Sequence, residues 1–202
     1  MNLATTSSDP RGSSQRSVQL ALLIVLAIVV VQAITLYAMG RHPICACGFV
    51  KLWEGNAFGP GNSQHLSDWY TPSHIIHGFI FYFFAWAVFR KASTAWHFAV
   101  AVFLEAAWEV VENTPWVIEY YRNNTASLGY VGDSIINSVM DVVWMSLGFL
   151  VAWRAPVLVT IVLALAMEAL AAYVIRDNLI LNILMFIYPF ESVKAWQTAI
   201  GQ

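Results

Sequence analysis

Histidines and acids recur at helical spacing inside stretches of this sequence that are otherwise apolar. His74 and His77 stand three residues apart, so both side chains would lie on one face of a helix. Two further polar stripes have the same character: Glu105, Glu109 and Glu112, then Asp133, Asn137 and Asp141. A charged group inside a hydrocarbon layer costs roughly 2.5 kcal/mol or more, so such residues usually mark a functional site.

The acids outnumber the cations that could neutralise them. Arg122 and Arg176 could pair with one or two carboxylates, and the others must be protonated, hydrogen-bonded, solvated or bound to a metal ion. Histidine combined with carboxylate oxygen suits Zn, Mn or Fe(II), so we predict a divalent metal cofactor. Its predicted ligands are His74, His77, Glu109 and Asp141. The predicted catalytic residues, acting as general base or as further ligands, are Glu105, Glu112 and Asp133.

Simpler interpretations of the same residues stay open. The two histidines could hydrogen-bond loop carbonyls near a membrane interface. The glutamates could be neutral carboxylic acids that hold helices together, as polar residues do in membranes. Asn137, together with Ser134 and Ser138, could serve the same packing role. Glu168 stands alone and is expected to be structural.

The composition indicates a membrane protein. Of 202 residues, 59% are apolar and only 11% are charged, against about 25% charged in soluble domains. The net charge of -2 and the absence of a basic run exclude nucleic acid as an expected partner. The expected partners are the lipid bilayer and a lipid or amphiphilic substrate, and the sequence names no protein partner.

The polar stripes would be positioned by an all-α polytopic membrane helix bundle. Five stretches of about 20 residues are long enough to span a bilayer. They cover residues 18–37, 71–91, 95–116, 132–153 and 156–175. A run over 179–190 is too short to cross, so we predict a short C-terminal interfacial helix there. Residues 1–17 are predicted to be a disordered polar tail, followed by a single membrane-embedded domain over 18–202.

Depth along these helices tests whether the polar residues could meet. At about 1.5 Å per residue, His77, Glu109 and Asp141 each lie roughly 20 Å from the same membrane face. Their spacing also aims each stripe to one side of its helix. Adjacent helices could therefore direct all of them into one pocket. The loop over 40–72 is predicted to cover this pocket. The predicted lid or substrate residues are His65, Asp68 and Tyr70 from this loop, and Asn137 from the span over 132–153.

Cys45 and Cys47 form a Cys-x-Cys pair just after the first predicted span. With one intervening residue a mutual disulfide is expected to be strained. Free thiols, pairing with another chain or a metal are therefore the alternatives. His42 precedes the pair and could complete a soft-metal site. Small buried residues at the end of a helix are the simpler interpretation.

Several motifs resemble an uncharacterised family of bacterial multi-pass inner-membrane proteins, a domain of unknown function. They are Ser63-Gln64-His65, Asp68-Trp69-Tyr70-Thr71, Ser73-His74-Ile75-Ile76-His77-Gly78, Trp108-Glu109-Val110-Val111-Glu112-Asn113 and Gly132-Asp133-Ser134-Ile135-Ile136-Asn137-Ser138. The resemblance runs from about residue 20 to the C-terminus. It implies a location in the bacterial inner membrane and supplies no activity.

Basic residues give a weak indication of orientation. Five lie on each predicted side: Arg11, Arg16, Arg90, Lys91 and Arg154 on one, and Arg41, Lys51, Arg122, Arg176 and Lys194 on the other. The first set lies in shorter loops close to the spans, where the positive-inside rule acts most strongly. We therefore expect a cytoplasmic N-terminus.

The function expected from these residues is a metal-dependent membrane hydrolase acting on a lipid or amphiphile. The metal would polarise a water molecule or a carbonyl or phosphoryl oxygen, while Glu112 or Glu105 accepts a proton. The alternatives are a proton or cation carrier that uses the same acids, and a non-catalytic membrane assembly factor. The sequence contains no His-Glu-x-x-His or Gly-x-Ser-x-Gly motif that would name a mechanism.

Overall fold

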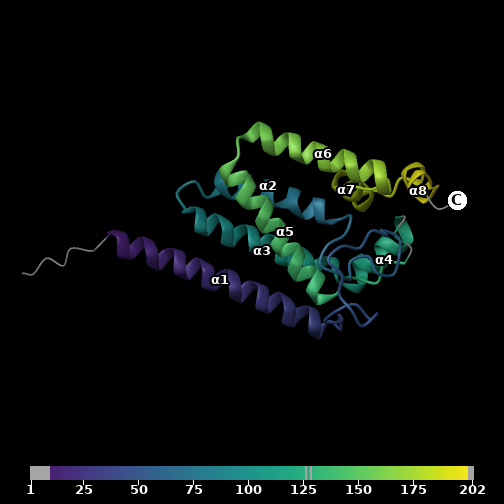
Figure 1. Cartoon of the computed structure of the whole chain (residues 1–202), viewed down its shortest axis with the longest axis horizontal. Coiled ribbons are helices and arrows are strands. Elements are labelled where there is room, and N and C mark those ends of the chain that lie inside the picture. Colours follow the sequence, from purple (N-terminus) through teal and green to yellow (C-terminus); the bar gives the residue numbers. More distant parts are fainter. Residues whose placement is uncertain (1–9, 126, 128, 200–202) are drawn as a thin grey trace, which may run out of the picture.

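A computed structural model describes residues 10–125, 127 and 129–199, and the side chains from residue 15 onward within them. All the regular secondary structure of the described chain is helical, which confirms the predicted fold class (Figure 1). Its eight helices are α1 Pro10–Ala38, α2 Thr71–Val88, α3 Thr94–Glu112, α4 Pro115–Asn124, α5 Ile135–Arg154, α6 Val157–Ile175, α7 Leu179–Ile187 and α8 Glu191–Thr198. Residues 10–17 of the expected polar tail belong to α1, and residues 1–9 lie outside the described part.

Four of the described helices are long and apolar enough to cross a membrane: α3, α5, α6, and α1 over Gln15–Ala38. By length and apolar content the count among the described helices is therefore four, where five were predicted. The expected second span forms the 18-residue helix α2, whose first two turns contain Ser73, His74 and His77 and lower its apolar content. α2 packs against both α3 and α5, and its second half exposes large apolar side chains such as Phe83 and Val88.

The outer helices carry the apolar surface that a lipid environment requires. Aliphatic side chains such as Leu23, Leu26, Leu158 and Leu165 on α1 and α6 are more than half exposed. In the apolar stretch by which each of these two helices could span a membrane, only 17% of the residues are buried. Exposed apolar surface of this extent is unfavourable in water, and it indicates helices that face acyl chains.

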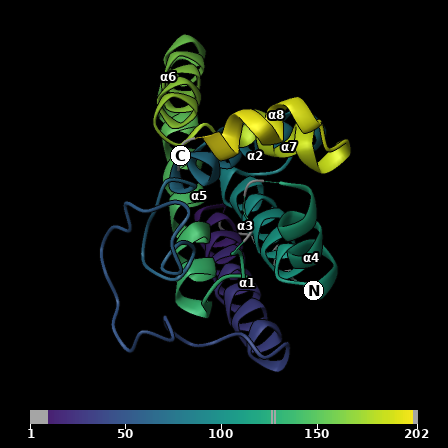
Figure 2. The same cartoon turned by 90° about the vertical axis from the view of Figure 1, so that its right-hand side faces the viewer.

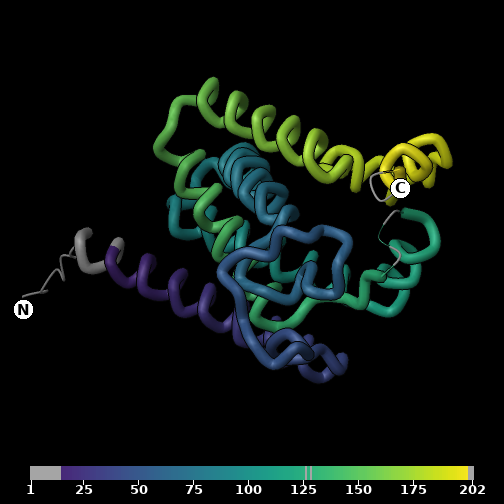
Figure 3. The backbone as a smooth tube through the Cα atoms, turned by 45° about the vertical axis from the view of Figure 1, so that its right-hand side comes forward, coloured from purple at the N-terminus to yellow at the C-terminus, as the bar shows by residue number. Residues whose placement is uncertain are grey.

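The connections gather at two opposite ends of the bundle (Figure 1). The α2–α3 and α5–α6 turns lie at one end, where Arg90 and Arg154 stack on Trp86 and Trp153 at 5.1 and 3.9 Å from the ring centroids. Such aromatic and basic pairs are typical of a membrane–water interface. The α1–α2 loop, α4, α7 and α8 gather toward the opposite end (Figure 3).

Two helical boundaries differ from the sequence-based expectation. The third predicted span was drawn to residue 116, but α3 ends at Glu112 and Pro115 begins the separate helix α4, with Thr114 accepting a hydrogen bond from the Val117 amide. Proline suits the first turn of a helix because its missing N–H would have no intrahelical partner there. The helix predicted over 179–190 is α7, which ends at Ile187, and a further short helix, α8, follows it; both lie crosswise to α6 (Figure 2).

α2 and α5 cross with their backbones in contact, and two glycines allow it. A Cβ atom on Gly78 would lie 2.1 Å from the Met145 carbonyl oxygen, and one on Gly148 would lie 2.0 Å from the Ile75 carbonyl oxygen. Small residues at such crossings let transmembrane helices approach closely. This crossing fixes the first turns of α2 beside the first half of α5.

Gly148→Ala is expected to separate α2 from α5 and to lower the free energy of unfolding by roughly 1–3 kcal/mol, the usual cost of overpacking. Thermal unfolding in detergent measures the change. Gly129→Ala is the matched control, because a Cβ there would meet nothing within 4 Å. Equal melting temperatures for the two variants would contradict the close crossing.

Candidate metal centre

Three helices bring the predicted ligands together in two groups that share His74: one with Glu109 and Asp141, the other with His77 and Glu105. α2 supplies His74 and His77, α3 supplies Glu105 and Glu109, and α5 supplies Asp141. Glu105 and Glu109 are completely buried, and His74 and Asp141 are buried beside them. The convergence expected from helical spacing and depth is therefore present in the structure.

Glu105 holds both histidines. Its Oε1 lies 2.6 Å from His74 Nδ1 and its Oε2 lies 3.0 Å from His77 Nδ1. A carboxylate can only accept, so in this arrangement both Nδ1 atoms donate and each Nε2 keeps a lone pair. A carboxylate that orients histidine in this way is common behind metal ligands.

Glu109 is a fully buried acid of this group whose charge is not compensated by hydrogen bonds from the described residues. Neither of its carboxylate oxygens has a hydrogen-bond partner among the described residues. One oxygen lies 3.6 Å from His74 Nδ1, beyond normal hydrogen-bond length. On the other side of the imidazole, Asp141 Oδ2 lies 3.7 Å from His74 Nε2. One ligand atom from each of His74, Glu109 and Asp141 can be chosen so that all three lie within 4.8 Å of one another.

A cavity of about 450 Å³ opens beside this cluster. Its polar wall includes His74, His77, Asp141 and Glu112, the last residue of α3. Its apolar wall comes from three helices and consists of Ile80, Phe81, Trp108, Leu179, Ile183, Phe186 and Ile187. The lining of the cavity is therefore amphipathic, because it combines acids and histidines with aliphatic and aromatic groups.

Asp133, predicted as a catalytic residue, lines the cavity with both carboxylate oxygens hydrogen-bonded. Asn113 Nδ2 donates to Oδ2 at 2.7 Å and the Tyr130 hydroxyl donates to Oδ1 at 3.0 Å. The Asp133 amide in turn donates to Asn113 Oδ1 at 2.7 Å. Burial raises the pKa of Asp133 to about 6, against the effect of these hydrogen bonds. The reciprocal pair ties the end of α3 to the segment that precedes α5.

The predicted lid residues divide into two groups. Asp68 and Tyr70 line the cavity. Asp68 accepts hydrogen bonds from the Ser63 and Tyr70 amides at 2.9 and 2.8 Å, and burial raises its pKa. The Tyr70 hydroxyl donates to Asp177 at 3.1 Å. These two residues therefore connect the long loop to the α6–α7 corner at the mouth of the cavity.

His65 and Asn137 hold the long loop onto α5. Asn137, which also lines the cavity, donates through Nδ2 to the His65 carbonyl at 2.9 Å. The His65 ring lies in the loop and lines a second cavity, not the one beside His74. The amides of Ser134 and Ile135 donate to the Ser63 and His42 carbonyls at 3.0 and 2.8 Å. The first amides of a helix have no intrahelical acceptor, and here the loop supplies acceptors for them.

Residues that sequence reasoning did not place in the site come from α4, from α7 and from the end of α3. Tyr121 lines the cavity and its hydroxyl donates to Asn182 Oδ1 at 2.8 Å. Asn113, also missed, directly follows the glutamate stripe, and its position there was the available signal. Glu168, expected to be structural, accepts hydrogen bonds from the Leu179 and Ile180 amides, both at 3.0 Å. It thereby caps α7 and holds the apolar wall in position.

The fold and the site define a helical membrane protein with a polar centre inside its bundle. Residues 36–199 match the family described as protein of unknown function (DUF2585). A UPF0314 protein of Agrobacterium fabrum is 54% identical over 175 residues, which cover 87% of this chain and 88% of the relative. One from Sinorhizobium fredii is 49% identical over 200 residues, covering 99% of this chain and 100% of the relative.

The chain therefore belongs to this uncharacterised bacterial family, which confirms the resemblance drawn from its motifs. A further relative, a UPF0314 protein of Paracoccus denitrificans, is 48% identical over 173 residues, covering 86% of this chain and 90% of the relative. No solved structure matches the chain.

Proposed function

We propose that this protein is a metal-dependent membrane hydrolase that acts on a lipid or another amphiphile. The observation that carries the proposal is the Glu109 carboxylate, which is fully buried and has no hydrogen-bond partner among the described residues. An isolated carboxylate in such a place is very unfavourable. A divalent cation held by His74, Glu109 and Asp141 would compensate its charge.

The candidate ligands lie close enough for a common ion, because one ligand atom from each lies within 4.8 Å of the other two. Two ligands about 2.0–2.2 Å from a tetrahedral zinc ion lie roughly 3.4 Å from each other. The 3.7 Å between His74 Nε2 and Asp141 Oδ2 is close to this value. Glu105 would act behind the metal by orienting His74, and His77 would stand beside it with Nε2 available. Nitrogen and oxygen ligands of this kind fit Zn, Mn or Fe(II).

Glu112 is the residue best placed to serve as general base. Both oxygens of Glu105 are engaged by histidines, whereas Glu112 lines the cavity where a substrate would lie. A metal ion supplies Lewis-acid polarisation of the substrate oxygen or of water. Glu112 would take a proton from the attacking water while the water oxygen forms a bond to the carbonyl carbon or the phosphorus of the substrate. The same proton would then pass to the departing alcohol as the ester bond breaks.

The lining of the cavity supports an amphiphilic substrate. A polar head group would lie against His77, Asp141 and Glu112, while an acyl or isoprenoid chain would contact the aromatic and aliphatic wall from α7. The carrier alternative has less support, because a carrier needs a polar route to the other membrane face. On that side of the site the described helices form an apolar core of Ala101, Val102, Val142, Met145 and Phe149.

The proposed orientation places the N-terminus in the cytoplasm and the α1–α2 loop outside the bacterial inner membrane. Arg90, Lys91 and Arg154 lie in the short turns at the opposite end of the bundle from this loop (Figure 1), as the positive-inside rule favours for the cytoplasmic face. The Cys45–Cys47 disulfide lies in the loop, and disulfides are typical of oxidising compartments. These two observations are independent and agree.

Purified wild-type protein is expected to retain about one divalent ion per chain, as a single site requires, measured by elemental mass spectrometry. Glu109→Gln and Asp141→Asn each remove a charged ligand and should lower metal affinity at least tenfold, on the order of known effects at metal sites. Glu119→Gln, the same change at an exposed acid on α4, is the control. Equal metal content in wild type, Glu109→Gln and Glu119→Gln would rule out the site.

Glu112→Gln is expected to keep the metal and to lower kcat about 10²- to 10⁴-fold, the usual contribution of a general base. Hydrolysis of fluorogenic acyl-ester and phosphodiester lipids in mixed micelles, with and without a chelator, measures this effect. A Glu112→Gln enzyme with wild-type turnover would remove Glu112 from the mechanism. Metal-loaded wild-type protein that moves protons or cations across liposomes, and hydrolyses none of these lipids, would favour the carrier.

Fusion proteins test the orientation. Alkaline phosphatase is active only outside the inner membrane. Fused after the full chain, beyond α8, it is therefore expected to be active, because α8 lies at the same end of the bundle as the α1–α2 loop. A fusion truncated after Ala92, in the α2–α3 turn, should be inactive. The reverse pattern would place the loop and the cavity mouth in the cytoplasm.

A further inference from the structure

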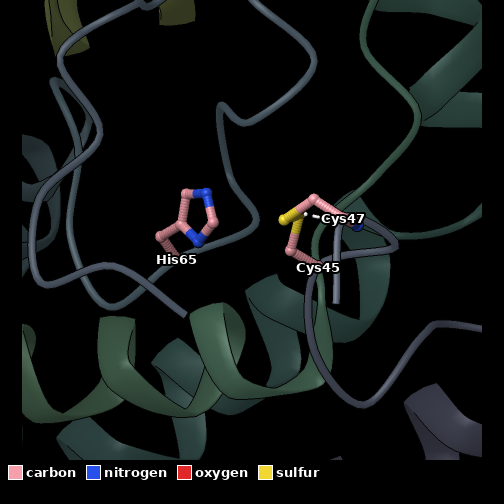
Figure 4. A group of neighbouring side chains, drawn as sticks. All are labelled: Cys45, Cys47 and His65. Carbon is pink, nitrogen blue, oxygen red and sulfur yellow. Dashed lines mark hydrogen bonds between the residues drawn. A yellow bond between two sulfur atoms is a disulfide. The ribbon is translucent and has the colours of Figure 1, made fainter. Parts of the chain in front are cut away.

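We infer that Cys45, Cys47 and His65 form a second metal site, for a soft ion such as Cu(I) or Zn²⁺, which becomes available when the Cys45–Cys47 disulfide is reduced. One ligand atom from each residue lies within 4.8 Å of the other two. Figure 4 shows the two sulfur atoms on the side of the cysteine pair that faces the His65 ring. The inference is independent of the proposed hydrolase activity, because none of these residues belongs to the cluster around His74.

The structure corrects the sequence-based expectation for this segment in two ways. Cys45 and Cys47 are joined in a disulfide and are not free thiols. The histidine grouped with them among the described residues is His65, from the far end of the loop, and not the neighbouring His42. Cys47 and His65 are 18 positions apart in the sequence, so sequence spacing alone could not pair them.

The disulfide contributes little to holding the loop. It encloses a single intervening residue, and the entropy that a cross-link removes from the unfolded chain decreases as the enclosed loop shortens. Other contacts already fix the loop: the Glu54 amide donates to the Ser67 carbonyl at 2.9 Å, and Trp69 Nε1 donates to the Gly55 carbonyl at 2.9 Å. A cross-link of so little structural value is better explained by the chemistry of its sulfur atoms.

The surroundings suit the reduced form as a ligand set. Cys45 is buried, and the Cys47 amide donates to its sulfur at 3.1 Å, which would stabilise a thiolate there. His65 is only 1% exposed, and its ring is held in position by stacking on Phe49 at 5.7 Å between centroids. The contact from the Lys51 amide to His65 Nδ1 is 3.3 Å long, so this nitrogen is only weakly engaged.

The Cys45–Cys47 disulfide is accessible to a reductant, and its reduction by a dithiol is balanced in electrons and protons. Cys47 is exposed and borders a cavity of about 680 Å³ that also contains Cys45, His65 and Glu54. A dithiol can attack the Cys47 sulfur, is itself oxidised to a disulfide, and leaves two electrons and two protons on Cys45 and Cys47. The ion then replaces the thiol protons, as in other thiolate sites. Two thiolates and one imidazole favour soft ions over Mn or Mg.

The test uses the full chain in detergent, either left oxidised or reduced with a phosphine that is then removed under argon. Cu(I) is titrated in competition with a chromogenic Cu(I) chelator. Reduced wild type is expected to take up about one Cu(I) per chain with an affinity at least 100-fold above that of the oxidised protein, because only the reduced sulfurs can ligate. This comparison needs no mutation, so misfolding cannot obscure it.

Variants then identify the ligands. Reduced His65→Gln should bind Cu(I) at least tenfold more weakly, whereas His42→Gln, which changes a histidine lining the same cavity, should bind as wild type does. Glu109→Gln should also bind Cu(I) normally, which separates this site from the one in the bundle. Equal affinity of oxidised and reduced wild type, or wild-type affinity in His65→Gln with unchanged helicity by circular dichroism, would overturn the proposal.

Discussion

The bidentate contact of Glu105 with two histidines is the interaction on which the polar centre depends. It joins α2 to α3 in the interior of the bundle, where a carboxylate without donors would be strongly unfavourable. It also fixes which imidazole nitrogens point away from α3. If Glu105 were absent, His74 and His77 would have no reason to keep their present ring orientations, and Glu109 and Asp141 would lose the group between them.

The second constraint is the backbone contact between α2 and α5, because it decides how near Asp141 comes to His74. Gly78 and Gly148 remove the side chains that would otherwise separate these helices. Asp141 and Gly148 are seven positions apart, about two turns of α5, so the buried acid and the closest approach of the backbones lie on the same side of the helix. The close packing of α2 and α5 at Gly148 therefore determines where Asp141 lies relative to His74, two turns away.

Helical spacing predicted the convergence of the polar stripes correctly, because the rise and twist of a helix fix both depth and direction. The same reasoning could not predict which partner each side chain would choose. Glu105 and Glu109 look equivalent in the sequence, yet one is doubly hydrogen-bonded and the other has no partner among the described residues. α4 and α8 were missed, and the end of α7 was placed too late, because short helices depend on local caps and on distant residues. Glu168, for instance, caps α7 from within α6.

The segment from Gly132 to Ser134 connects the two proposed metal sites. Asp133 lines both the cavity beside His74 and the cavity beside Cys45. Gln64 Nε2, next to His65, donates to the Gly132 carbonyl at 2.8 Å, and Ser134 donates back to the Gln64 carbonyl at 3.1 Å. The loop and the start of α5 are thus held together by reciprocal hydrogen bonds, with Asn137 adding a third to His65. A displacement of His65 would therefore also move residues that line the cavity beside His74, because these hydrogen bonds connect the loop to the start of α5.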